Sequence, residues 1–324
     1  MNISHIYSNE IPDFLSDALE TPPLVRLKNV GMNCGCEYTS FSRFAGIESY
    51  TRYEHSLGAA LIVWHFTHDK AQSMAALLHD ISTPVFAHVV DFLKGDYMTQ
   101  EATEADTESF IRSSPELLAV LERYSLSVDA VKDYHIYPIA DNDSPKLSSD
   151  RLEYTVGNMI NFGFADIETA REIYQSLTVT DGELAFTDMP HALKFAECAL
   201  ECSKIYVSDE DRYAMQILSE ILRDAVGNGV LTYNDLSTTE PEVIKKLLGD
   251  SNFAKQWKNY VNQSATETAY EPHQGSTWRK IYAKKRCIDP YVIGFGRLSE
   301  ADAEFSRKLK AFLDDTQDYW IRSF

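Results

Sequence analysis

The sequence predicts a mostly α-helical protein with a small β part. Most of the chain carries helical patterning, and residues 51–69 and 71–81 are apolar without a clean polar face, which is typical of helices buried on most sides. Strand-like runs are confined to residues 177–186 and 287–295. We expect helices over residues 51–69, 71–81, 84–94, 115–124, 147–161, 166–176, 189–205, 209–226, 240–248 and 300–320.

The clearest β signal is the pair Asp181-Gly182. It separates two runs of β-favouring residues within 177–186, which is the pattern of a β-hairpin. Residues 226–298 hold more Gly, Asn, Thr and Tyr, and residues 287–295 are expected to add one or two further strands. We therefore divide the chain into a helical core, residues 1–225, and a C-terminal α+β accessory region, residues 226–324, packed on that core.

The composition is that of a globular protein with a strong acidic balance. Its 324 residues are 44% hydrophobic, which is enough to bury a large core. The 30 Lys and Arg against 49 Asp and Glu leave a formal charge of −19. Duplex nucleic acid is therefore not an expected partner, because nonspecific affinity comes largely from cations that neutralise phosphates. A nucleotide could still bind locally, where a metal and arginines such as Arg52 and Arg151 offset the field of the whole molecule.

The sequence lacks the marks of a membrane or secreted protein. The longest apolar run, residues 57–66, is too short to cross a bilayer, and residues 1–5 do not begin a signal peptide. The five cysteines fit no zinc pattern and are expected to be reduced thiols. We expect a cytoplasmic protein with no membrane partner, and leave open whether it forms a homo-oligomer.

Two histidines and two aspartates on predicted helices form a candidate metal site. His55, His79, Asp80 and Asp150 combine imidazole nitrogen with carboxylate oxygen, which suits one divalent transition metal, Mn, Fe, Co, Ni or Zn, better than structural zinc. Neighbouring helix residues point about 100° apart, so His79 and Asp80 reach one ion only near a helix end. Pro84 provides such an end, because a residue before proline is pushed away from helical angles.

The sequence around these residues resembles the HD-domain phosphohydrolase superfamily. Within that superfamily it is similar to the branch of the bacterial dGTP triphosphohydrolases and the SAM-and-HD-domain deoxynucleotide triphosphohydrolase. The matching motifs are Arg26-Leu27, Phe44-Ala45-Gly46, Thr51 to Gly58, Leu77 to His88 and Asp150 to Tyr154. The resemblance covers residues 20–225 and implies an HD-domain helical core that holds one metal through the four residues above.

The resemblance also implies a reaction. Members of the superfamily hydrolyse phosphate esters through metal-activated water, so we expect a small phosphorylated substrate, in the first place a nucleotide. His88 and Asp91 match residues that line the family's pocket and are candidate catalytic residues. Arg52, Arg151 and Tyr154 match positions near the substrate phosphates or the metal ligands. The alternative for each arginine is a salt bridge that orients a ligand carboxylate.

Two positions depart from the triphosphohydrolase pattern. Thr83 and Gln100 stand where those enzymes have histidines, and neither side chain titrates near neutral pH. Thr83 has a structural explanation as the N-cap of a helix that begins at Pro84. Glu101, in the acidic segment 96–108 that we expect to be a mobile loop beside the site, is a candidate replacement proton donor. The alternative function is a degenerate HD protein that binds a metal or nucleotide in a regulatory, non-catalytic role.

Overall fold

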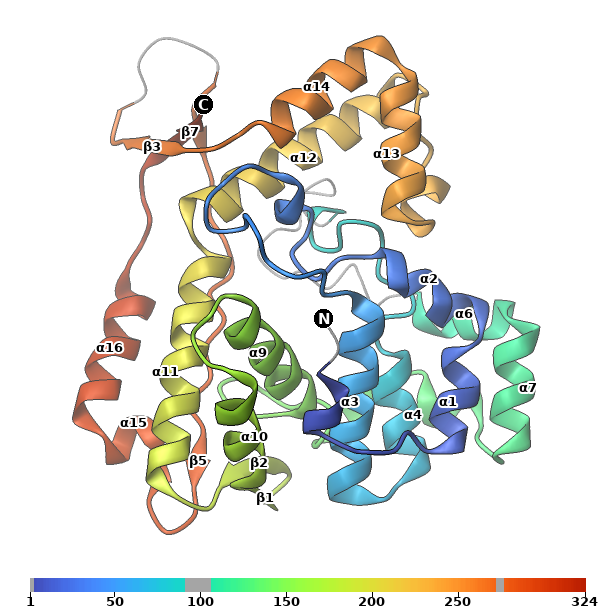
Figure 1. Cartoon of the computed structure of the whole chain (residues 1–324), viewed down its shortest axis with the longest axis vertical. Helices are drawn as coiled ribbons and strands as arrows, with labels where there is room; N and C mark the ends of the chain where they lie inside the picture. Colours follow the sequence, from blue (N-terminus) through green and yellow to red (C-terminus); the bar gives the residue numbers. More distant parts are fainter. Residues whose placement is uncertain (1–2, 91–105, 272–276) are drawn as a thin grey trace.

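The computed structural model describes residues 3–90, 106–271 and 277–324 (Figure 1). Helices make up 57% of the structure and its sheets are small, so the predicted mostly α-helical fold with a small β part is confirmed. The N-terminal helices are α1 (Asp13–Leu19), α2 (Pro22–Arg26), α3 (Arg52–Thr67) and α4 (Lys70–Leu78), with 3-10 turns at Ser4–Ile6, Leu27–Asn29 and Cys36–Tyr38.

The remaining helices complete the body of the protein. The middle of the chain forms α6 (Thr107–Ser113), α7 (Pro115–Arg123), α8 (Val128–Val131), α9 (Ser149–Asn161), α10 (Ile167–Gln175), α11 (Met189–Tyr206) and α12 (Asp209–Gly227). The C-terminal part forms α13 (Glu240–Gly249), α14 (Ser251–Val261), α15 (Leu298–Ala301) and α16 (Ala303–Asp314), and further 3-10 turns lie at Tyr134–Ile136 and Tyr233–Ser237.

Helices α3 and α4 pack side by side, and α9 packs against α3 (Figure 1). Thr51 begins α3 with a capping box, in which its hydroxyl accepts from the N–H of Glu54 and the Glu54 carboxylate accepts from the N–H of Thr51. The C-cap of α3 is His68, in the left-handed conformation, and Asp69 caps α4 through two backbone N–H groups. These local signals fix where α3 ends and where both helices begin.

The strands form two small sheets. The predicted hairpin is confirmed, since β1 (Leu177–Thr180) pairs antiparallel with β2 (Glu183–Phe186) and both turn residues have positive φ. The expected strands near residues 287–295 are present as β5 (Tyr291–Val292), which runs parallel to β2, and β6 (Gly296–Arg297). The second sheet has the order β3 (Thr266–Ala269), β7 (Trp320–Ser323) and β4 (Arg279–Lys280).

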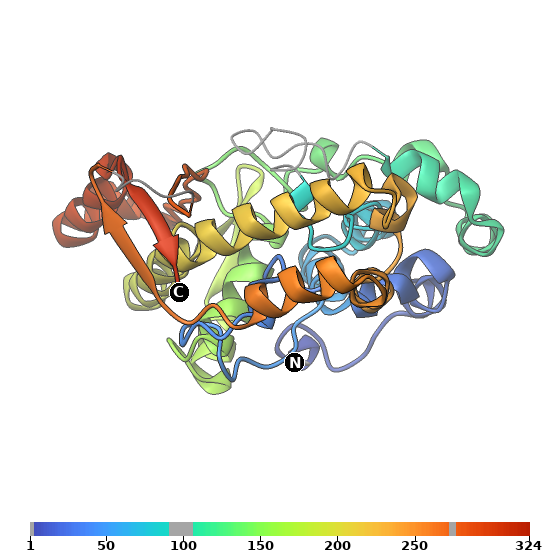
Figure 2. The ribbon, with the colours of Figure 1, turned by 90° about the horizontal axis from the view of Figure 1, so that it is seen from above.

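Buried apolar side chains form two clusters. The first is built on α3, α4, α9 and α11 and includes Phe305 and Phe312 of α16. The second joins Val85 and Phe86 to side chains of α12, α13 and α14, the gold and orange helices that cross the near face of the molecule in Figure 2. The accessory region thus packs on earlier helices in both clusters, and α12 crosses residue 225. The division of the chain at residue 225 stays a prediction.

Two of the expected helices are wrong in part. Residues 84–88 form turns in which Phe86 and Ala87 have φ of 58° and 46°, so no helix begins at Pro84. The N–H of Val85 donates instead to the carbonyl of Leu236 at 2.8 Å, a tertiary contact that overrides the local proline signal. The helix expected over residues 300–320 ends at Asp314, and the chain goes on to strand β7.

Two further expectations concern membrane-spanning helices and the state of the cysteines. Within the described ranges, no helix is long and apolar enough to cross a membrane. The five cysteines are free thiols and four of them are buried, as expected of reduced structural residues.

Candidate metal centre

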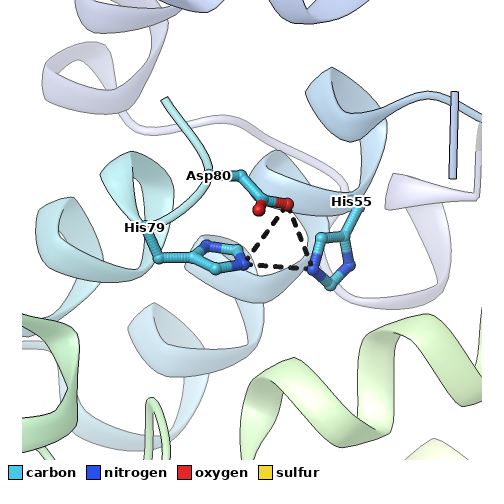
Figure 3. A group of neighbouring side chains, drawn as sticks. All are labelled: His55, His79 and Asp80. Carbon is cyan, nitrogen blue, oxygen red and sulfur yellow. Dashed lines mark hydrogen bonds and ion pairs between the residues drawn. The ribbon is translucent and has the colours of Figure 1, made fainter. Parts of the chain in front are cut away.

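Three helices bring the four predicted metal ligands together. His55 lies in the first turn of α3, His79 and Asp80 directly follow α4, and Asp150 lies in the first turn of α9. Nε2 of His55 is 3.2 Å from Nε2 of His79 and 3.0 Å from Oδ1 of Asp150. Oδ2 of Asp80 is 3.9 Å from Nε2 of His55 and 3.5 Å from Nε2 of His79 (Figure 3). His55, His79 and Asp80 therefore form a group that could hold a metal ion.

The end of α4 lets two neighbouring residues face the same point. The helix stops at Leu78, so His79 and Asp80 are released from the 100° spacing of a regular helix. Arg26 holds the turn that follows, since its Nη2 donates to the carbonyls of Ile81 at 2.9 Å and Thr83 at 2.8 Å. The helix end that the sequence predicts before Pro84 is therefore present, although a turn and not a new helix follows it.

Both imidazole rings direct Nε2 toward the space between the four side chains. Nδ1 of His55 lies 2.6 Å from Oε2 of Glu153, and Nδ1 of His79 lies 2.7 Å from the carbonyl oxygen of Ala76. Carbonyl and carboxylate oxygens accept, so each Nδ1 donates and each Nε2 is left to act as a ligand. A partner on the far nitrogen is the usual arrangement around a metal-ligating histidine.

The electrostatics of the four side chains favour a cation between them. Burial lowers the pKa of His55, but hydrogen bonds to Asp150 and Glu153 outweigh it and raise the pKa to about 10, so an ion that binds at Nε2 must displace a proton. Burial also opposes ionisation of Asp80, yet Arg52 and the two histidines bring the pKa of Asp80 below its ordinary value. The two aspartates are therefore anionic and attract positive charge. The donor set, two imidazole nitrogens and two carboxylates, fits a divalent transition metal.

Arg52 and Thr83 both hold Asp80. Nη1 of Arg52 lies 3.1 Å and 2.9 Å from the two carboxylate oxygens, and the Thr83 hydroxyl donates to Oδ1 at 2.6 Å. The sequence predicts that Thr83 is the N-cap of a helix beginning at Pro84. This prediction is wrong, because residues 85–88 form a turn and the next helical residue is Val89. Arg52 lines the same cavity as the ligands, but its observed partner is the ligand carboxylate.

Glu153 lies within the motif Asp150 to Tyr154, but the sequence alone does not assign it a role in the site. Its side chain is fully buried, and it accepts from the hydroxyl of Tyr50 as well as from His55. Gly58 on α3 makes room for it, because a Cβ at Gly58 would lie 2.5 Å from Oε1 of Glu153. A glycine inside an apolar helical pattern often marks such a close approach, and this was the signal in the sequence.

Arg151 and Tyr154 follow Asp150 on α9 and differ in their surroundings. Nη1 of Arg151 pairs with Asp141 at 3.1 Å, and its Nε donates to the carbonyl of Lys146 at 2.8 Å. Arg151 thus holds the loop before α9, although it also lines the cavity. Tyr154 lines the cavity too, and its ring packs edge-on against Tyr206.

The candidate catalytic residues are placed only in part. His88 lies in the turn after Pro84, not on a helix face, and its Nε2 is 3.2 Å from Nη2 of Arg286. A guanidinium group only donates, so this nitrogen of His88 accepts and carries no proton. Asp91, Gln100 and Glu101 lie outside the described residues, as does most of the segment expected to be a mobile loop.

The four predicted ligands line a cavity of about 590 Å³, a size that suits a small-molecule site. Aromatic and cationic side chains share its lining with the ligands. The aromatic ones are Phe44, Tyr134, Tyr154, Phe162 and Tyr206, and the cationic ones are Arg52, Arg151, Arg212, Lys284 and Arg286. Lys284 and Arg286 belong to the C-terminal region, for which the sequence provides no functional signal.

Two curated proteins are similar to this chain in sequence. No protein-family model matches the chain. It is 24% identical over 260 residues to the uncharacterized protein YdhJ of Bacillus subtilis, covering 78% of this chain and 77% of the relative. It is 26% identical over 208 residues to the metal-dependent phosphohydrolase cns2 of Cordyceps militaris, covering 63% of this chain and 58% of the relative.

Solved structures share the fold over nearly the whole chain. A phosphohydrolase from Bacteroides thetaiotaomicron matches with a TM-score of 0.65 at 15% identity, covering 97% of this chain and 96% of that one. A hypothetical protein from Aquifex aeolicus matches with a TM-score of 0.67 at 16% identity, covering 97% and 93%. Together with the sequence relatives and the His-His-Asp group, these likenesses support the resemblance to HD-type phosphohydrolases.

Proposed function

We propose that this protein is a metal-dependent phosphohydrolase of the HD type that hydrolyses a nucleotide or another small phosphate ester. The observation that carries the proposal is the convergence of His55, His79, Asp80 and Asp150 in the wall of a cavity of small-molecule size. The sequence similarity to a metal-dependent phosphohydrolase supports it. We propose that the four residues hold one ion of Mn, Fe, Co, Ni or Zn.

The protein's own contacts prepare the site for this ion. Glu153 and the carbonyl of Ala76 orient the two imidazole rings, while Arg52 and Thr83 hold the Asp80 carboxylate. A divalent ion bound there would offset the charge of a phosphate group and acidify water. Ligands that are already held in place lose little conformational freedom when the ion binds.

The remaining candidate residues divide by chemistry. We assign His88 to proton transfer, because it lines the same cavity as the four proposed ligands and imidazole is the side chain best suited to exchange a proton near neutral pH. Asp91 and Glu101 are the proposed proton donors. Of the proposed substrate contacts, Tyr154 is the strongest, because Arg52 and Arg151 already hold Asp80 and Asp141.

Deoxynucleoside triphosphates are the first substrates to test, since the sequence resembles enzymes that hydrolyse them. Thr83 replaces one of their histidines and is committed to Asp80, so a proton donor must come from elsewhere. General acid–base help contributes roughly 10²–10⁴ in rate. We therefore expect a slower triphosphohydrolase or a different phosphate ester as the preferred substrate.

The test is a screen of the metal-reconstituted protein against nucleoside mono-, di- and triphosphates and generic phosphodiesters, reading out both phosphate and nucleoside. We expect hydrolysis that a chelator stops and that one of the five metals restores. His79→Ala should lose both bound metal and activity, whereas His5→Ala, which removes an exposed histidine, should lose neither. Full metal content without hydrolysis of any substrate would favour the non-catalytic binding protein instead.

A further inference from the structure

The C-terminal region sends an extended segment across the cavity of the metal centre. Residues 281–289, which we name the strap, join β4 to β5 and form neither helix nor strand. Ala283, Lys284 and Arg286 of the strap line the same cavity as the metal ligands. The strap is thus a wall of the site that comes from outside the α3, α4 and α9 unit.

Hydrogen bonds fix the strap at both ends. At its start, Ile281 is buried and its carbonyl accepts from Nη1 of the fully buried Arg212. At its end, the N–H of Asp289 donates to the carbonyl of Pro145 at 2.9 Å, and the Asp289 carboxylate accepts from the N–H of Ser299 at 2.9 Å. Cations on the strap are therefore held at a set place along the cavity, as a binding site requires.

The side chains of the strap alternate, as they do in any extended chain. Lys285 turns away from the cavity, where its Nζ donates to backbone carbonyls at the end of α16, including that of Leu313 at 3.1 Å. Lys284 and Arg286, on either side of it, line the cavity. Arg286 reaches His88 at 3.2 Å, and its charge also lowers the pKa of Tyr154 against the larger effect of burial. Arg286 therefore lies among the candidate catalytic and substrate residues.

The charge balance of the site calls for cations at this wall. The chain carries a formal charge of −19, and Asp80, Asp141 and Asp150 all line the cavity, so an anionic ligand needs positive side chains in the cavity wall. Arg52 and Arg151, the arginines that the sequence singles out, are bonded to two of these aspartates and largely cancel their charge. Lys284 and Arg286 bring two further positive charges to the same cavity.

We propose that Lys284 and Arg286 bind the phosphate groups of the substrate. The phosphate-binding residues of this site then come from the C-terminal strap and not from the helical core. The proposal rests on the function proposed above, and it names the class of ligand as one whose phosphate oxygens lie against the strap. Arg offers a planar fork of donors that matches phosphate oxygens, and Lys adds a point charge. The two residues act in binding, and they need not touch the reacting atoms.

The experiment compares two double variants of the full chain. Lys284→Gln with Arg286→Gln removes both cations, and Arg307→Gln with Lys310→Gln removes the same charge from exposed positions of α16. Isothermal titration of each metal-loaded protein with inorganic pyrophosphate measures phosphate binding directly. Hydrogen bonds to charged groups are typically worth about 1.5–3 kcal/mol, so we expect at least tenfold weaker pyrophosphate binding in the strap variant. The α16 variant should bind like wild type.

Further measurements on the same proteins test the proposal. Metal content and the thermal melting profile should be unchanged in the strap variant, and Arg286→Lys, which keeps the charge, should recover part of the affinity. Equal pyrophosphate affinity in wild type and strap variant, or absence of binding to wild type, would overturn the proposal. The two proposals can also fail separately. If the wild type binds pyrophosphate and the strap variant does not, but the wild type hydrolyses no phosphate ester, the strap assignment stands and the phosphohydrolase function is rejected.

Discussion

The carboxylate of Glu153 lies 2.6 Å from Nδ1 of His55, and neither side chain is exposed to solvent by more than 1%. Glu153 is on α9 and His55 on α3, so this one contact joins the two helices that supply opposite sides of the candidate metal centre. It also fixes the nitrogen with which His55 can bind an ion. Four predictions follow from contacts of this kind.

Glu153→Gln should weaken metal binding without unfolding the protein. The amide keeps the shape of the carboxylate and can still accept from His55, but it lacks the negative charge that makes the imidazole a stronger ligand. Loss of such a partner typically costs 10–100-fold in metal affinity. Competition with a chelator of known affinity measures the change. Glu122→Gln, on the exposed side of α7, is the control, and equal affinity in both variants would contradict the role given to Glu153.

Gly58→Ala should destabilise the protein through the same carboxylate. A Cβ at this position would lie 2.5 Å from Oε1 of Glu153, a distance that forces a buried side chain to move. Overpacking of this kind typically costs about 1–3 kcal/mol. In Gly227→Ala, at the end of α12, the added Cβ meets no neighbouring atom within 4 Å, and alanine should be neutral or stabilising. Urea unfolding of the two variants compares them, and similar stabilities would refute the packing argument.

Thr83→Val should loosen Asp80 while it keeps the shape of the buried side chain. The lost hydroxyl donates to Oδ1 of Asp80 at 2.6 Å, and a bond to a charged group is worth about 1.5–3 kcal/mol. Arg52 still holds the carboxylate, so we expect a loss of metal affinity nearer tenfold than a hundredfold. Metal titration checks this, with Thr178→Val on β1 as the matched control. A variant with wild-type metal affinity would show that Arg52 alone suffices.

Asp211→Asn should change how stability depends on pH. Burial raises the pKa of Asp211 to about 8, so the folded chain holds this proton more tightly than the unfolded chain does. The stability that comes from this group is complete below the ordinary pKa of aspartate, and it is lost as the pH rises toward 8. The free energy of unfolding of the wild type should therefore fall between about pH 4 and pH 8.

The asparagine variant cannot ionise at this position and should lose part of that slope, so that it gains stability relative to the wild type at pH 8. Urea unfolding at several pH values measures both proteins. Asp224→Asn, exposed on the same helix, controls for the change in net charge. Parallel pH profiles for wild type and Asp211→Asn would show that burial does not hold the proton in the folded state.

Much of this protein follows from local sequence signals. The capping box at Thr51, the Asp-Gly turn at residue 181 and the helix end before Pro84 all act over a few residues, and the structure contains each of them. The four proposed ligands were recognisable for a related reason, because each lies in a short sequence motif on a predicted helix or at its end.

Tertiary structure alone decided which groups surround those ligands. His55 and Glu153 are 98 residues apart, His88 and Arg286 are 198 apart, and Val85 bonds to Leu236 where the local pattern predicts a helix. No periodicity or capping rule reports contacts over such separations, because they depend on how whole helices pack. The sequence by itself thus determined the candidate metal ligands and the helical fold around them. Packing decided that Arg52 and Thr83 hold the Asp80 carboxylate, and that Lys284 and Arg286 line the cavity.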